Sequence, residues 1–360
     1  MKRTCFTILL LLFLFGCQDN FDPPWLINKP RILGTYVSIE GRPNQNWPRP
    51  GESVRLDWLV ADTQADTSYQ WFMLACVAAP TLSGSGLCAD LPFALSQDTG
   101  SAPFFELAVP EVLPAELAAA LPKVLVAGVI CARGDLSLKE GFDLQTAQNN
   151  PDVFALLNEG TECNGQKTER TLVSFDLQID LLDQPNTHPS FDTVPVSIFL
   201  SAWDEPPPEL ADQGPCSPPP ANDAASLTGG ILDSDGNIKV LSTFQIEDSR
   251  LPVISRDDPG LPFILYFAPS SADTYVVGSE TSALVTDVEN FYLSSFTTYG
   301  SLDKLFSVAA VDYPQVLVQW TPPKSTDEGI PKEPFLTAFY FVLRDFRGGL
   351  DMRRRLICVR

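Results

Sequence analysis

Residues 53–60 of the chain read SVRLDWLV, and their apolar side chains recur at every second position. Val54, Leu56, Trp58 and Val60 therefore share one face of an extended chain, which is the pattern of a half-buried β-strand. The preceding Pro50-Gly51 supplies a turn. Residues 171–179, TLVSFDLQI, repeat the alternation. These runs predict sheets with one face turned toward a core.

Comparable runs continue through most of the chain. They predict strands at residues 69–75, 104–109, 124–131, 194–200, 238–246, 263–267, 291–296 and 316–320, and a C-terminal hairpin of 335–344 and 352–359. Ile238, Val240, Phe244 and Ile246 are expected to face inward. Short helices are predicted at 114–121, which is rich in Ala, and at 150–157, where Asn150-Pro151-Asp152 starts a helix that Gly160 ends.

Length, composition and charge narrow the class of protein. A chain of 360 residues favours two domains, and 32 Pro with 23 Phe favour strands and turns. A net charge of −21 argues against nucleic-acid binding, which requires clustered cations. His188 is the single histidine, so histidine-rich metal sites and most histidine-based catalysis are excluded.

The strand spacing predicts an all-β fold of two immunoglobulin-like β-sandwich domains with short helical insertions. The N-terminal Leu14-Phe15-Gly16-Cys17 resembles the lipobox of bacterial lipoproteins, which implies a lipoprotein signal peptide before the first domain. We expect the signal peptide at residues 1–16, a lipidated cysteine and tether at 17–28, and the first sandwich with its helical insertion at 29–183. The second sandwich, with a Pro-rich loop near 206–220, is expected at 184–360.

The N-terminus has the pattern of an export signal. Lys2 and Arg3 precede the apolar run 6–15, which is about half as long as a membrane-spanning helix. The run ends in Leu14-Phe15-Gly16-Cys17, which resembles the lipobox of bacterial lipoproteins. That resemblance implies cleavage before Cys17 and acylation of its thiol. The next residue, Gln18, favours the outer membrane, at its periplasmic face or at the cell surface. The alternative is an ordinary secretory signal cut elsewhere, or an uncleaved anchor.

Six cysteines remain once Cys5 and Cys17 are set aside, and an even number in an exported protein predicts disulfides. Proximity in sequence favours the pairs Cys76–Cys88 and Cys131–Cys163, which leaves Cys216–Cys358. Six cysteines allow 15 connectivities. A metal site is the rival interpretation, but the chain contains no CxxC pair.

Both ends of the expected folded region resemble one group of bacterial proteins. Residues 28–33 (NKPRIL), 50–54 (PGESV) and 69–71 (YQW) are similar to the first strands of bacterial immunoglobulin-like or PKD-like domains, and residues 342–351 (VLRDFRGGLD) are similar to their final hairpin. Together with the lipobox, this pattern resembles lipoproteins of myxobacteria and related predatory or social bacteria. The resemblance implies fold and location, and it implies no activity.

Few residues suggest chemistry. The segment Asp233-Ser234-Asp235-Gly236-Asn237 is favoured as a hairpin turn, with a calcium loop as the alternative. His188 lies in the expected interdomain linker and no GxSxG motif is present, so we expect no catalytic residue, metal or cofactor. Trp47 and Trp203 stand beside prolines in expected loops and are candidate platforms for sugar rings.

The sequence therefore predicts a non-catalytic cell-envelope lipoprotein. Its expected partners are the membrane, through Cys17, and an envelope protein or glycan, or else it is a structural component of the surface. A carboxylate-based polysaccharide hydrolase is one alternative, because acidic residues are abundant. A passive spacer is the other.

Overall fold

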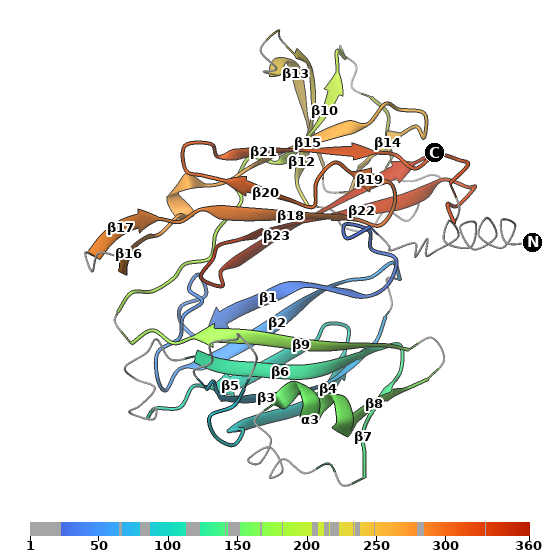
Figure 1. Ribbon diagram of the computed structural model, residues 1–360. Coiled ribbons are helices and arrows are strands. Elements are labelled where there is room, and N and C mark those ends of the chain that lie inside the picture. The colour runs from blue at the N-terminus through green and yellow to red at the C-terminus, as the bar shows by residue number, and fades with distance from the viewer. Residues whose placement is uncertain are drawn as a thin grey trace, which may run out of the picture.

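A computed structural model gives the structure of the chain. It describes residues 23–360 except 65–66, 80–86, 113–122, 141, 143–151, 166–167, 182, 204–207, 212–215, 217–222, 233, 235–237, 248, 279–283 and 328. The regular secondary structure of the described residues is almost entirely β-strand, and the sheets pack as β-sandwiches, which confirms the predicted fold class (Figure 1). The predicted helix at 114–121, Cys17 and most of the Asp233–Asn237 segment lie outside the described residues.

The first sandwich packs a three-stranded sheet, β1-β2-β5, against a four-stranded sheet, β4-β3-β6-β9. Its strands are β1 (Arg31–Ile39), β2 (Ser53–Ala61), β3 (Tyr69–Val77), β4 (Ala94–Gly100), β5 (Phe104–Ala108), β6 (Lys123–Ala132) and β9 (Glu169–Gln178). All neighbouring strands are antiparallel. The first, second and fifth strands form one sheet, as in immunoglobulin-like domains, while the fourth pairs with the third rather than the fifth.

An insertion between β6 and β9 covers the outer face of the four-stranded sheet. It contains the hairpin β7 (Asp135–Leu138) and β8 (Thr161–Asn164) and the helix α3 (Val153–Gly160). The Asp152 carboxylate caps this helix by accepting from the N–H groups of Phe154 and Ala155. Because Val153 and Leu157 pack on that face, β3 and β6 are buried on both sides and read as nearly unbroken apolar runs.

The second sandwich is larger. Its two six-stranded sheets have the orders β13-β12-β10-β15-β21-β19 and β11-β14-β23-β22-β18-β20. Their strands are β10 (Val196–Ser201), β11 (Leu210–Ala211), β12 (Ala225–Leu232), β13 (Ile238–Ile246), β14 (Leu251–Ile254), β15 (Leu261–Tyr266), β18 (Phe291–Thr297), β19 (Ser301–Leu302), β20 (Phe306–Ala309), β21 (Gln315–Thr321), β22 (Phe335–Arg344) and β23 (Leu350–Val359). A 3₁₀ turn (Pro269–Ser271) precedes a separate hairpin of β16 (Thr274–Gly278) and β17 (Leu284–Val288).

Two pairs in this sandwich, β10 with β12 and β14 with β23, are parallel. Parallel neighbours require crossover connections, so the second sandwich departs from the arrangement of the first. The expectation that Val240 faces inward is wrong, because its side chain is 56% exposed. Ser242 pairs with Gly229 and Val240 with Gly230, so a bulge at Leu241 interrupts the alternation on the edge strand β13.

The two sandwiches share an apolar interface. Leu33 and Ala61, on the outer face of β1 and β2, pack with Tyr340, Val342 and Leu350, on the outer face of β22 and β23. Figure 1 shows β1 lying next to β23 across this interface. Strand β22 is consequently buried on both faces, which explains its nearly unbroken apolar sequence.

Gly34 permits the close approach of the two sheets. It lies in β1, where the register with β2 shifts. A Cβ at this position would lie 2.3 Å from Cδ1 of Leu350, so a larger residue fits only if the side chain of Leu350 moves.

All three favoured disulfides are present. Cys76–Cys88 and Cys131–Cys163 fasten the first sandwich, the latter tying the inserted hairpin to β6, and Cys216–Cys358 joins the segment after β11 to the last strand. The corresponding Cα–Cα distances are 5.6, 5.6 and 5.8 Å.

Candidate functional site

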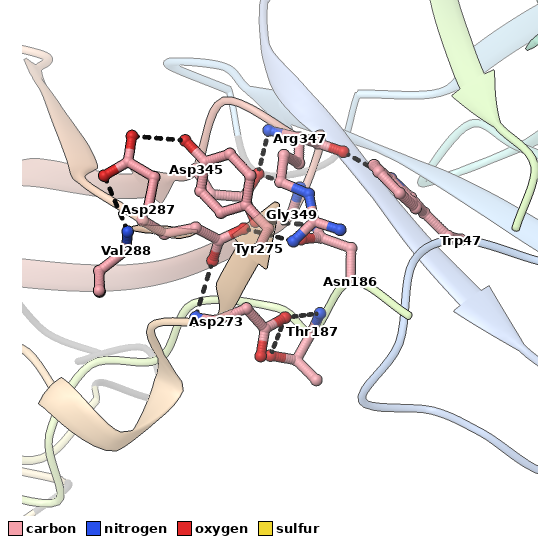
Figure 2. Close-up of polar contacts among 11 residues, drawn as sticks. Trp47, Asn186, Thr187, Asp273, Tyr275, Asp287, Val288, Asp345, Arg347 and Gly349 are labelled. Carbon is pink, nitrogen blue, oxygen red and sulfur yellow. Dashed lines mark hydrogen bonds and ion pairs between the residues drawn. The ribbon is translucent and has the colours of Figure 1, made fainter. Parts of the chain in front are cut away.

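The most elaborate polar arrangement lies where the sandwiches meet, and we call it the joint. Four segments that are distant in sequence contribute to it: the loop 42–50, the linker 184–190, the β16–β17 hairpin with Glu289, and the β22–β23 turn at 345–349. Figure 2 shows these side chains converging around Arg347.

Arg347 is the central cation of the joint. Its guanidinium carbon lies 4.2 Å from the ring centre of Trp47 and 5.2 Å from that of Tyr275, so an aromatic ring from each sandwich contacts it. Nη1 lies 3.1 Å from Oε1 of Glu289. The indole N–H of Trp47 donates to the main-chain carbonyl of Arg347 at 2.8 Å, which ties the loop 42–50 to the turn (Figure 2).

Two buried carboxyl groups, Glu289 and Asp345, surround this cation. Asp345 is 7% exposed; its Oδ1 accepts from the main-chain N–H groups of Arg347 and Gly349, each at 2.7 Å, and its Oδ2 accepts from Asn186 at 3.0 Å. Glu289 is 3% exposed, and its second oxygen accepts from the N–H of Asp273 at 3.1 Å. All four carboxyl oxygens are thus hydrogen-bonded within the protein.

Burial governs the acidity of both groups. Desolvation, followed by the charge of Asp345, raises the pKa of Glu289 to about 7. Desolvation also raises the pKa of Asp345 above its usual 3.8, against the hydrogen bond from Asn186. Arg347 is therefore the cation that faces two carboxyl groups, and burial disfavours the ionised form of both.

The linker is fastened to both sandwiches. Asp273 accepts from the N–H and the hydroxyl of Thr187, at 2.7 and 2.9 Å (Figure 2). The ring of His188 stacks on Tyr36 of β1, with centroids 4.2 Å apart and planes 14° apart. Its Nδ1 accepts from the N–H of Leu350 at 3.1 Å, and its Nε2 lies 2.7 Å from the carbonyl oxygen of Val37.

These contacts specify the form of the imidazole. Since Nδ1 accepts a hydrogen bond, the proton of the neutral ring is on Nε2, which donates to Val37. Burial lowers the pKa of His188 below its usual 6.5, against the Val37 carbonyl and the carboxylates of Asp345 and Asp351. With both nitrogens engaged, His188 is not available as the base of a serine nucleophile.

The two tryptophans selected from the sequence are less accessible than expected. Trp47 is half-buried, with the guanidinium of Arg347 over its ring. Trp203 is also half-buried and packs on the core of the second sandwich, where its ring would lie 2.3 Å from a Cβ at Gly229. Both rings are thus partly covered by internal contacts. Sugar binding by either residue stays a prediction.

The predicted turn at Asp233–Asn237 falls between two paired strands. The strands that flank Asp233–Asn237 pair as an antiparallel hairpin, but the segment itself, apart from Ser234, lies outside the described residues. No group of three or more His, Cys, Asp or Glu within the described ranges is arranged as metal ligands would be. No helix in the described part of the chain is long and apolar enough to cross a membrane.

The sequence did not identify Glu289, Asp345 or Arg347. The turn 345–349 could be predicted from its glycines, but its carboxylate and guanidinium look like ordinary turn residues. The available signal was the run Phe335–Arg344, since an unbroken apolar strand indicates that both faces of its sheet are covered.

No protein-family model matches the chain, and curated proteins show no significant similarity to it. Among solved structures, red sea bream transglutaminase is similar with a TM-score of 0.21 and 9% identity, over 92% of this chain and 32% of that one. The D0-D1 domain of intimin is similar with a TM-score of 0.18 and 8% identity, over 91% of this chain and 98% of that one. Dimeric latent PorU from Porphyromonas gingivalis is similar with a TM-score of 0.15 and 10% identity, over 92% and 34%.

The chain spans about a third of the length of the transglutaminase and of PorU. Similarities of this size establish neither a shared fold nor a shared activity.

Proposed function

We propose that this protein is a non-catalytic lipoprotein of the bacterial cell envelope. It is anchored through Cys17 in the outer membrane and presents its two sandwiches to a protein or glycan partner, or serves as a structural component of the surface. The observation that carries the proposal is the set of three disulfides, because such bonds persist in oxidising compartments outside the cytoplasm. The lipobox-like Leu14-Phe15-Gly16-Cys17 supplies the anchor.

The joint supports presentation as one rigid unit. An apolar interface and hydrogen bonds from Trp47 and His188 connect the sandwiches. Domains joined only by a linker reorient freely, whereas a large apolar interface prevents this. A rigid pair of domains holds its exposed loops at a fixed spacing from the anchor.

The same geometry weighs against the hydrolase alternative at this site. Glu289, with a pKa of about 7, has the acidity of a general acid. However, both of its oxygens and both of those of Asp345 are engaged by protein groups. A substrate would have to displace these bonds and open the joint. Their arrangement suits a structural link.

The test of anchoring is the intact mass of the full-length protein extracted from membranes in detergent, with and without reduction and alkylation. We expect a chain that begins at Cys17, carries acyl chains and gains six alkyl groups only after reduction. A mass that retains Met1, or thiols that react without reduction, would refute the envelope assignment.

The test of the binding role uses the same preparation against glycans and envelope extracts. We expect saturable binding without turnover. Product formation that disappears on changing an Asp or Glu would establish the hydrolase instead, and absence of binding to every ligand would leave the spacer. Trp47→Ala and Trp203→Ala, compared with each other, measure any contribution of these rings to glycan affinity.

A further inference from the structure

The joint contains the only histidine of the chain, and that residue connects the two sandwiches directly. One ring nitrogen contacts the carbonyl of Val37 in β1, and the other accepts from the N–H of Leu350 in β23. His188 itself belongs to the linker. Its imidazole is thus a hydrogen-bonded bridge between strands of different domains.

This bridge requires a neutral ring. A protonated imidazole carries a hydrogen on both nitrogens and has no acceptor. In the observed geometry the added hydrogen on Nδ1 would point at the N–H of Leu350, so the bond between ring and β23 would become a repulsive contact between two donors. The ring cannot turn away without also losing Val37 and the stack on Tyr36.

The charged neighbours of the ring moderate this effect. Tyr36 faces it from β1, and Asp345 and Asp351 face it from the β22–β23 turn and β23. Both carboxylates favour a protonated ring, but desolvation acts more strongly in the opposite direction and lowers the pKa of His188. Asp273 binds the adjacent Thr187 and fixes the linker. Glu289, paired with Arg347, also titrates near neutrality and has the opposite sign, since its protonation removes a buried charge.

We propose that the joint is acid-sensitive, in that protonation of His188 breaks the contact with Leu350 and weakens the link between the two sandwiches. The apolar interface remains, so the sandwiches are held less tightly in acid than at neutral pH. The three disulfides each lie within one sandwich, so weakening the link leaves both domains folded.

The first experiment is NMR of the full-length, untagged protein in detergent, labelled in its histidine ring. Because the chain has one histidine, its ring signals need no assignment by mutation. We expect the Nε2–H tautomer at pH 7.5 and a titration midpoint below 6.5. A mixture of tautomers, or a midpoint at or above 6.5, would overturn the proposal.

The second experiment is hydrogen exchange at pH 7.5 and pH 5, corrected for the intrinsic effect of pH on exchange. Peptides from β1 and β23 should lose protection in acid. The loss is at most tenfold for each unit by which the pKa of the ring differs between the open and the closed state. Peptides from β3 and β6, in the first core, should not change.

Two variants make the second experiment specific. His188→Gln keeps one donor and one acceptor but cannot be protonated, so its β1 and β23 peptides should show no loss in acid. Glu289→Gln should keep the loss, because it leaves His188 intact. Equal acid dependence in wild type and His188→Gln, or no dependence in wild type, would overturn the proposal.

Discussion

Glu289→Gln should remove a loss of stability that the wild-type protein undergoes as the pH rises from 4.5 to about 7. The carboxyl is 3% exposed, and its pKa is raised from 4.5 to about 7. Because the native pKa lies above the unfolded one, the cost of ionising Glu289 in the native state is absent below pH 4.5 and complete above about pH 7. At about 1.4 kcal/mol per pH unit, this cost amounts to ~3 kcal/mol. A glutamine has the same shape and does not titrate.

The measurement is urea denaturation at pH 5 and pH 8, followed by tryptophan fluorescence, with hydrogen exchange of β18 and β22 peptides to assign the transition to the second sandwich. Between these pH values, wild type should lose about 2–3 kcal/mol more free energy of unfolding than Glu289→Gln. The control is Asp287→Asn, an exposed carboxylate on the same hairpin, which should follow wild type. Parallel losses in wild type and Glu289→Gln would refute the assignment of a buried, titrating Glu289.

Two further predictions concern the interface and the disulfides. Gly34→Ala should lower the free energy of unfolding by ~1–3 kcal/mol, because the added methyl group presses against Leu350, and calorimetry measures the loss. Gly100→Ala is the control and should be tolerated, because a Cβ there would lie an ordinary 3.4 Å from its neighbour. Replacing the Cys216–Cys358 pair by serines should lower the free energy of unfolding by roughly 2 kcal/mol more than replacing the Cys76–Cys88 pair does. The reason is loop length, because the first disulfide joins residues 142 positions apart and the second joins residues 12 positions apart. Equal losses would contradict the loop-entropy account.

Local patterns were sufficient to predict most strands. The alternation in residues 53–60 and 171–179 corresponds to β2 and β9, and the C-terminal hairpin begins at Phe335 as predicted. Each of these signals depends on neighbours within a few residues. The bulge at Leu241 does not, because it is set by the pairing with Gly229 and Gly230, and the inward placement of Val240 was therefore predicted wrongly.

The joint could not be derived in this way. Trp47 and Arg347 are separated by 300 positions, and Asn186 and Asp345 by 159. No periodicity links such residues, and each taken alone is typical of a loop. Trp47 shows the consequence: a tryptophan between polar and proline residues looks exposed until its partner from the other domain is placed.

The disulfide Cys216–Cys358 also determines how the chain bears mechanical load. When the chain is pulled by its two ends, the covalent path passes from residue 216 directly to residue 358. The residues between these two cysteines, which include most of the second sandwich, carry no tension. About 500 Å of extended chain is thereby withheld from stretching. Such a pull loads the first sandwich, the linker and the strands β10 and β11, whereas the strands from β12 to β22 can be extended only after the Cys216–Cys358 bond is reduced.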